Sequence, residues 1–179
     1  MPGWSQETYI KAFRFAAKAH LGQTFPGTDL PYIMHVSFVC IEIMAALTVE
    51  KGWDGDLAVQ CALLHDVVED TKITLEDLQR PFGERVVDGV KALTKDEAIP
   101  ETHRLSDSLM RITEQPREIW MVKLADRITN LQPPPPGWTK EKISNYLADA
   151  HRIHAALKDS SPYLASRLED KITTYVNYL

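Results

Sequence analysis

Residues 57–71, LAVQCALLHDVVEDT, place ionisable side chains at the end of an apolar helical run. Apart from Gln60 the run is apolar on every side, which predicts a helix inside the protein. Four ionisable residues then follow within six positions: His65, Asp66, Glu69 and Asp70. The first and third are one helical turn apart, as are the second and fourth, so all four are expected on about half of one helix surface. Burying unpaired carboxylates costs several kcal/mol, a conflict that a divalent cation bound by these side chains resolves.

Helical periodicity also dominates the rest of the chain, and no stretch alternates as a strand does. Serine and threonine residues that precede apolar runs, such as Ser5 and Thr74, are typical helix N-caps. Proline and glycine mark loops at 22–31 and 133–136, and a polar connection is expected at 94–102. We predict helices that start near residues 5, 33, 55, 74, 83, 105, 139 and 162, with 55–70 continuous and 105–131 interrupted only near Pro116. The sequence therefore predicts an all-α fold, with residues 1–179 forming a single domain.

Two further apolar segments carry isolated polar residues. WMVKLADRITNLQ, residues 120–132, contains Asp126 with Asn130 one turn later, and PYIMH places His35 at the start of an apolar helix. Taken singly, each feature is typical of an ion pair or a hydrogen-bonded core residue. Their coincidence in three apolar helices instead indicates a metal site. Two histidines and two aspartates form a mixed nitrogen and oxygen set, which suits Mn²⁺, Fe²⁺ or Zn²⁺ better than Mg²⁺.

The charge and composition of the chain limit the kinds of molecule that it can bind. The net charge of −5 excludes an overall positive field for binding nucleic acid, so we expect a small-molecule substrate. The first 20 residues lack the features of a signal peptide, and the longest apolar stretch, 36–49, is too short to span a membrane. Cys40 and Cys61 lie in apolar surroundings and are expected to be buried and reduced. These features predict a cytoplasmic protein, and they leave the oligomeric state open.

Several segments resemble the HD superfamily of metal-dependent phosphohydrolases. More narrowly, they are similar to the hydrolase domain of the RelA/SpoT alarmone enzymes and to the stand-alone small alarmone hydrolases. The resemblance rests on GQ at 22–23, PYIMH at 31–35, ALLHDVVEDT at 62–71, FGERVVDGVKALTK at 82–95 and VKLADRITNL at 122–131. It implies an HD-type helical bundle that removes a 3′-pyrophosphate from a nucleotide such as ppGpp.

The resemblance also implies a role for individual residues. The Mn²⁺ ligands would be His35, His65, Asp66 and Asp126, while Glu69 and Asp70 match the acidic pair that positions and activates the attacking water. Asn130 and Tyr146 match residues that contact the substrate, and Lys95 and Arg104 lie where the family often places phosphate-binding cations.

The sequence departs from the guanosine-type enzymes after Gln23. Those enzymes carry a basic stretch whose arginine stacks on the base, whereas this chain has Phe25 and Pro26 there. Phe25 can stack on any purine, so an adenosine alarmone such as ppApp competes with ppGpp as the expected substrate. Two other hypotheses stay open. One is an HD phosphohydrolase acting on mononucleotides or on the 2′-phosphate of NADPH, and the other is a catalytically silent nucleotide-binding module.

Overall fold

The computed structural model describes residues 3–179, and within this range every regular element is a helix. The predicted all-α fold is therefore confirmed. The α-helices are α1 (Gln6–Ala19), α2 (Ile33–Val49), α3 (Gly55–Leu64), α4 (Val67–Asp70), α5 (Leu75–Phe82), α6 (Glu84–Leu93), α7 (Glu101–Thr113), α8 (Arg117–Asn130), α9 (Lys140–Leu157) and α10 (Pro162–Tyr175). Short 3₁₀ turns, η1 (Lys158–Ser160) and η2 (Val176–Tyr178), follow α9 and α10.

The helices start where the capping residues predict. Ser5 accepts a hydrogen bond from the Thr8 amide at the start of α1, and Thr74 forms a reciprocal capping box with Asp77 at the start of α5. The Thr139 side chain accepts from the Lys142 amide at the start of α9, and the Ser161 side chain accepts from the Leu164 amide at the start of α10, just before a proline in the first turn. These side chains satisfy backbone amides that a helix start otherwise leaves unpaired.

Two predicted helices are divided. The predicted helix 55–70 stops at Leu64, and α4 begins only at Val67, so the assumption of one continuous helix surface is wrong. The predicted helix 105–131 consists of α7 and α8, because Pro116 lacks the amide that a helix interior requires. The polar connection after α6 is also shorter than predicted, since α7 already begins at Glu101.

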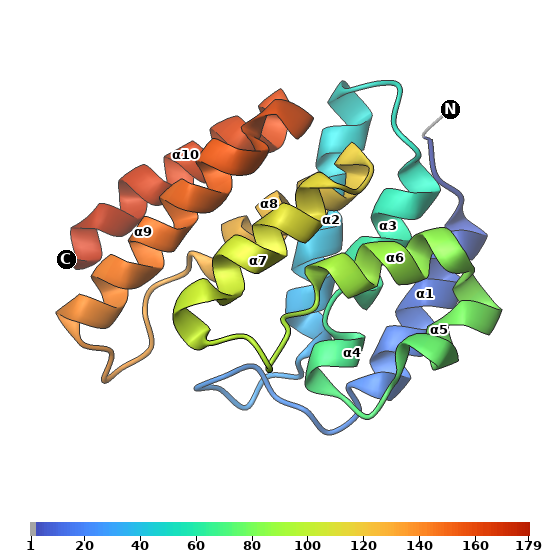
Figure 1. Ribbon diagram of the computed structural model, residues 1–179, viewed down its shortest axis with the longest axis horizontal. Helices are drawn as coiled ribbons and strands as arrows, with labels where there is room; N and C mark the ends of the chain where they lie inside the picture. Colours follow the sequence, from blue (N-terminus) through green and yellow to red (C-terminus); the bar gives the residue numbers. More distant parts are fainter. Residues whose placement is uncertain (1–2) are drawn as a thin grey trace.

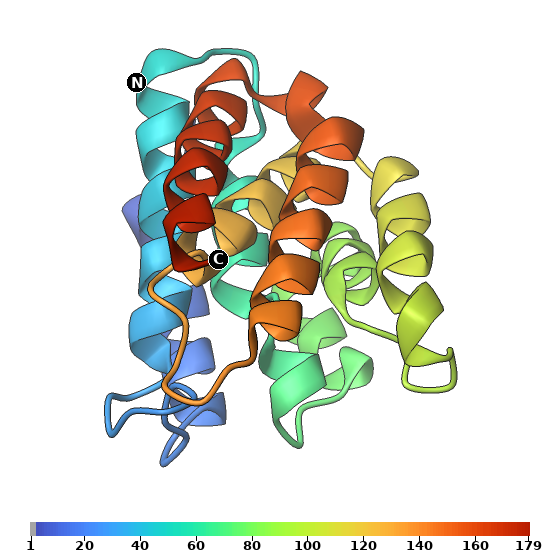
Figure 2. The same ribbon diagram turned by 90° about the vertical axis from the view of Figure 1, so that its left-hand side faces the viewer.

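Helices α2, α3 and α8 pack against one another in the middle of the molecule, and almost every residue of α3 is buried. The pair α9 and α10 lies along one side, while α1, α5 and α6 lie toward the other (Figures 1 and 2). Both cysteines are buried and free, as predicted. No helix within residues 3–179 combines the length and the apolar character needed to cross a membrane.

Candidate metal centre and active-site cleft

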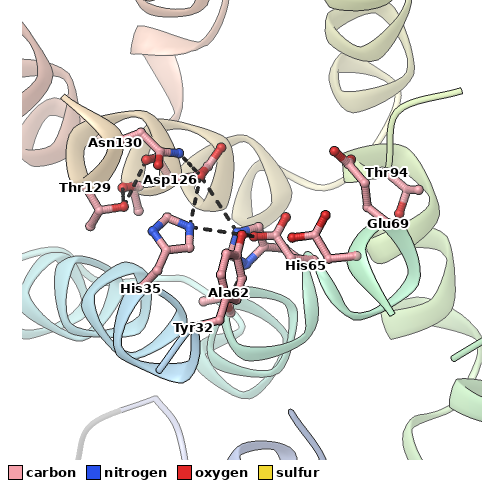
Figure 3. Close-up of polar contacts among 12 residues, drawn as sticks. Tyr32, His35, Ala62, His65, Glu69, Thr94, Asp126, Thr129 and Asn130 are labelled. Atoms are coloured by element: carbon pink, nitrogen blue, oxygen red, sulfur yellow. Dashed lines mark hydrogen bonds and ion pairs between the residues drawn. The ribbon is translucent and has the colours of Figure 1, made fainter. Parts of the chain in front are cut away.

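Imidazole and carboxylate groups from the three central helices meet at one point. His35 lies in the first turn of α2, His65 and Asp66 form the break between α3 and α4, and Asp126 lies on α8. The Nε2 atom of His35 lies 3.6 Å from Asp66 Oδ2 and 3.5 Å from Asp126 Oδ1. The Nε2 atom of His65 lies 2.9 Å and 3.8 Å from the same two oxygens. Figure 3 shows the two imidazoles and Asp126 directed toward one another.

These donors fit a divalent metal ion. Ligand atoms about 2.0–2.2 Å from one ion lie about 3.0–3.6 Å from each other, close to the separations observed here. His65 Nδ1 lies 2.9 Å from the carbonyl oxygen of Ala62, so this nitrogen carries a ring hydrogen and Nε2 is the atom directed at the carboxylates. Nε2 is buried between Asp66 and Asp126 and can hold either a second proton or a cation there. That position is what a bound cation requires.

Neighbouring side chains hold the two carboxylates in place. The Tyr32 hydroxyl donates a hydrogen bond of 2.6 Å to Asp66 Oδ2. Lys123 Nζ donates to Asp126 Oδ2 at 3.0 Å, and Asn130 Nδ2 donates to Asp126 Oδ1 at 2.6 Å. The hydrogen bond from Tyr32 was not predicted from the sequence, whereas the three-residue spacing from Lys123 to Asp126 indicates the observed ion pair. Asn130, predicted as a substrate contact, also donates to Asp126.

In the absence of a cation, a proton on His65 balances part of the negative charge of Asp66 and Asp126. Burial opposes a charge on His65, but the Asp66 and Asp126 carboxylates outweigh it and raise the pKa of His65 well above its usual value. Burial likewise opposes ionisation of Asp66, yet His65 brings its pKa down to about 2. The pKa of Asp126 also lies well below its usual range, because Lys123 and the two imidazoles overcome the effect of burial. A bound cation would take the place of the proton on His65.

The acidic pair that follows the cluster diverges. Glu69 turns toward the end of α6, where its Oε1 lies 2.5 Å from Lys95 Nζ and its Oε2 accepts from the Lys95 amide at 2.9 Å. Asp70 turns the other way, and its Oδ2 accepts from Gln23 Nε2 at 3.3 Å. Burial, followed by the charge of Asp66, raises the pKa of Asp70. Glu69 and Asp70 are adjacent on α4, so their side chains turn toward different walls of the site, one toward Lys95 and the other toward Gln23.

A cavity of about 370 Å³, here called the central cavity, lies over the metal donors. Its lining includes His65, Asp66, Glu69, Asp70 and Asp126. Two further cavities adjoin it, because each shares four lining residues with it. The first shares Tyr32, Asp70, Asn130 and Tyr146, and the second shares Lys95, Lys123, Arg127 and Asp149. The three cavities form one cleft with the metal donors in the middle.

The first neighbour, the aromatic cavity, has a volume of about 390 Å³. Aromatic rings, proline rings and amides line it: Gln23, Phe25, Pro26, Tyr32, Gln132, Pro133, Pro134, Pro135, Trp138, Tyr146 and Tyr175, with Asp70 and Asn130 toward the metal donors. The ring of Phe25 lies 5.7 Å from that of His35, and the ring of Tyr146 packs edge-on to Trp138 at 5.2 Å. Phe25, Asn130 and Tyr146, all predicted to bind substrate, therefore line the same space.

The second neighbour, the cationic cavity, has a volume of about 290 Å³ and lies among α7, α8, α9 and Lys95, two residues after the end of α6. Its lining residues are Lys95, Glu101, Arg104, Leu105, Ser108, Lys123, Arg127 and Asp149. Lys95 and Arg104, the two predicted phosphate-binding cations, both belong to it. The structure thus brings every predicted site residue to the metal donors or to one of the three cavities.

Comparison with known proteins agrees with this arrangement. A model of the HD domain family matches residues 12–157. The chain belongs to the HD domain family. The matched range contains all four predicted metal ligands of this HD domain, and the resemblance inferred from the sequence is confirmed.

Relatives of this HD domain include proteins of similar length and longer proteins in which it matches one part. It is 30% identical to human guanosine-3′,5′-bis(diphosphate) 3′-pyrophosphohydrolase MESH1 over 165 residues, covering 89% of this chain and 90% of the human protein. It is 35% identical over 130 residues to the bifunctional (p)ppGpp synthase/hydrolase SpoT of Escherichia coli, covering 68% of this chain but 17% of SpoT. A solved structure described as a metazoan SpoT orthologue that hydrolyses ppGpp superposes with a TM-score of 0.82 at 26% identity, covering 98% of this chain and 99% of that one.

Proposed function

We propose that this HD domain is a Mn²⁺-dependent 3′-pyrophosphohydrolase of alarmone nucleotides, which releases pyrophosphate from (p)ppGpp and (p)ppApp. The observation that carries this proposal is the position of the metal donors, between a cavity lined by aromatic rings and one lined by cations. A nucleoside suits the first cavity and a phosphate chain suits the second. The human relative is named as a 3′-pyrophosphohydrolase, and the metazoan structure is described as hydrolysing ppGpp. Both are similar to this chain over nearly their full length.

The ion would be held by His35, His65, Asp66 and Asp126, and when bound it supplies Lewis acidity and an acidified water. Mn²⁺ suits this mixture of nitrogen and oxygen donors. Tyr32, Lys123 and Asn130 fix the carboxylates, so little reorganisation is needed as the substrate binds.

Proton transfer falls to the acidic pair. Burial and the charge of Asp66 raise the pKa of Asp70, which makes its ionised form a stronger proton acceptor than an ordinary aspartate, and Gln23 orients its carboxylate. Glu69 is held by Lys95 on the opposite wall, where it can orient the attacking water. The water oxygen bonds to the phosphorus that carries the 3′ oxygen, and the bond from phosphorus to that oxygen breaks. The 3′ oxygen takes up a proton, so the products are pyrophosphate and a nucleotide with a free 3′-hydroxyl.

The aromatic cavity governs the choice of base. Its lining among the described residues includes neither lysine nor arginine, and its neutral polar groups include the amides of Gln23 and Gln132. Stacking on Phe25 is tolerant of base identity because every purine has a π face. We therefore propose that adenine and guanine alarmones are both substrates.

Three further proposals complete the function. Residues 1–179 act as a single domain. The protein works in the cytoplasm. Its substrate is a free nucleotide rather than a nucleic acid. The net charge of −5 supports the last of these.

The decisive experiment incubates purified protein and Mn²⁺ with ppGpp, ppApp and NADPH in parallel and separates the products by anion exchange. We expect pyrophosphate from both alarmones, and a loss of at least about 100-fold in Asp66→Ala, which removes a metal ligand. Asp88→Ala, an equal change at an exposed position of α6, is the matched control. Phosphate release from NADPH alone would instead indicate another HD phosphohydrolase. No turnover of any compound would indicate a silent module.

A further inference from the structure

The cationic cavity contains hydrogen-bonding groups that the protein itself leaves unused. Ser108 Oγ is buried, with the residue only 3% exposed, and it has no hydrogen-bond partner in residues 3–179. Arg127 Nε and Nη1 are buried and equally unpartnered within the described chain. Buried polar groups are nearly always hydrogen-bonded in folded proteins, so three free groups on the wall of one cavity indicate a missing ligand.

The charges of the cavity identify the class of ligand. Lys95 and Lys123 face the central cavity and are already paired with Glu69 and Asp126. The Arg104 guanidinium donates to the carbonyl oxygens of Glu97 and Ile99, and it has no carboxylate partner among the described residues. Asp149 is paired with Arg152, and Glu101 is exposed at the start of α7. The two arginines therefore leave an excess of positive charge, which an anion would balance.

Arg127 is positioned to bind that anion. Its guanidinium lies 4.3 Å from the centre of the Tyr146 ring, a stacking contact that holds one face and leaves the N–H groups on the edge free. A guanidinium carries several N–H donors in one plane, and those of Arg127 Nε and Nη1 are free to bind phosphate oxygens. Arg127 also lines the central cavity, so its donors lie at the junction of the two spaces.

We propose that the cationic cavity binds the distal phosphate of the 3′-diphosphate, with Ser108 and Arg127 as its specific donors. The inference rests on the proposed function. The proximal phosphate then lies over the metal donors while the nucleoside occupies the aromatic cavity. The same subsite makes the enzyme prefer a diphosphate to a monophosphate, since a monophosphate leaves the Ser108 and Arg127 donors unpaired.

The first test measures this preference. For the wild type, Ser108→Ala, Arg127→Gln and the control Arg80→Gln, kcat/KM is compared between ppGpp and the same nucleotide carrying a 3′-monophosphate. Arg80→Gln removes one charge at an exposed position of α5. We expect the ratio of the two values to fall about tenfold or more in Ser108→Ala and in Arg127→Gln, the cost of one lost hydrogen bond to a charged group, and to stay unchanged in Arg80→Gln. An unchanged ratio in Ser108→Ala and Arg127→Gln would overturn the subsite.

The second test needs no turnover, so it separates this inference from the proposed function. Inorganic pyrophosphate is titrated into metal-free protein in EDTA by calorimetry, with orthophosphate as the shorter anion. We expect pyrophosphate to bind more tightly than orthophosphate, and its affinity to fall about tenfold in Ser108→Ala, which leaves the stacking on Tyr146 intact. Equal pyrophosphate affinity in the wild type and Ser108→Ala overturns the inference, even if the protein hydrolyses alarmones. Binding that depends on Ser108 upholds the subsite, even if no alarmone is hydrolysed.

Discussion

At the scale of single residues, three of the four candidate metal donors have a hydrogen-bond partner that fixes them. Tyr32 holds Asp66, the Ala62 carbonyl oxygen holds His65, and Lys123 and Asn130 hold Asp126. Such partners orient a ligand and tune its basicity, so their loss weakens metal binding without removing a donor. The site thus depends on more residues than the four that contact the ion.

Tyr32→Phe tests this dependence. The substitution removes the 2.6 Å hydrogen bond to Asp66 and keeps the ring, so we expect the affinity for Mn²⁺ to fall about tenfold. Titration of metal-free protein with Mn²⁺, followed by electron paramagnetic resonance, measures the change. Tyr163→Phe makes the same change at a tyrosine on α10, away from the metal donors, and should leave the affinity as it is. Equal affinities in the two variants would show that Tyr32 does not support the ligand.

At the scale of elements, capping residues in the sequence predicted where helices start, whereas features that depend on the packing of distant segments were predicted only in part. Ser5, Thr74, Thr139 and Ser161 mark helix starts because a cap involves only the next few residues. The break at His65 carries no such local mark. The cluster of candidate metal ligands could be predicted because isolated acids and histidines in apolar helices are conspicuous. Lys95 and Arg104 of the cationic cavity were also predicted, but Ser108 and Arg127 were not, because they line one cavity only when α7 packs on α8.

The packing of α6 gives a prediction for this scale. A Cβ added at Gly89 would lie 2.6 Å from Ile119 Cδ1 and 2.9 Å from Cys61 Sγ, at the contact of α6 with α3 and α8. Alanine is favoured over glycine by about 1 kcal/mol in a helix, but this overlap acts between fully buried groups. We therefore expect Gly89→Ala to lower the free energy of unfolding by about 1–3 kcal/mol in urea denaturation. Asp88→Ala is the control, and a gain in stability at Gly89 would contradict the packing argument.

At the scale of the whole molecule, one ion would join parts of the chain that are far apart in sequence. His35, His65 and Asp126 come from α2, the end of α3 and α8, and these helices form the centre of the core. Binding at such a site is linked to folding, because the unfolded chain cannot bring the ligands together. Metal affinity and global stability should therefore change together.

The linkage has a predictable pH dependence. In metal-free protein the pKa of His65 lies well above 6.5, so the stability from its ion pairs is complete below pH 6.5 and is lost as the pH rises through the folded-state pKa. Mn²⁺ competes with that proton, so the rise in Tm on adding Mn²⁺ should be larger at pH 8 than at pH 6. At 100 times the Kd we expect about 2.7 kcal/mol, or about 5–10 °C, by scanning calorimetry. Equal increments at both pH values would argue against His65 as a ligand.

Different kinds of structural element supply the residues that line the three cavities. The metal donors lie on the central helices or directly after α3. Phe25, Pro133–Pro135 and Trp138 belong to loops, and Ser108 lies on the outer helix α7. Loops and surface helices accept replacement more readily than a close-packed centre. Recognition of the base and of the phosphate chain can therefore diverge while the reacting centre stays fixed. Substitutions confined to two loops and one helix face could therefore change which nucleotide this protein prefers.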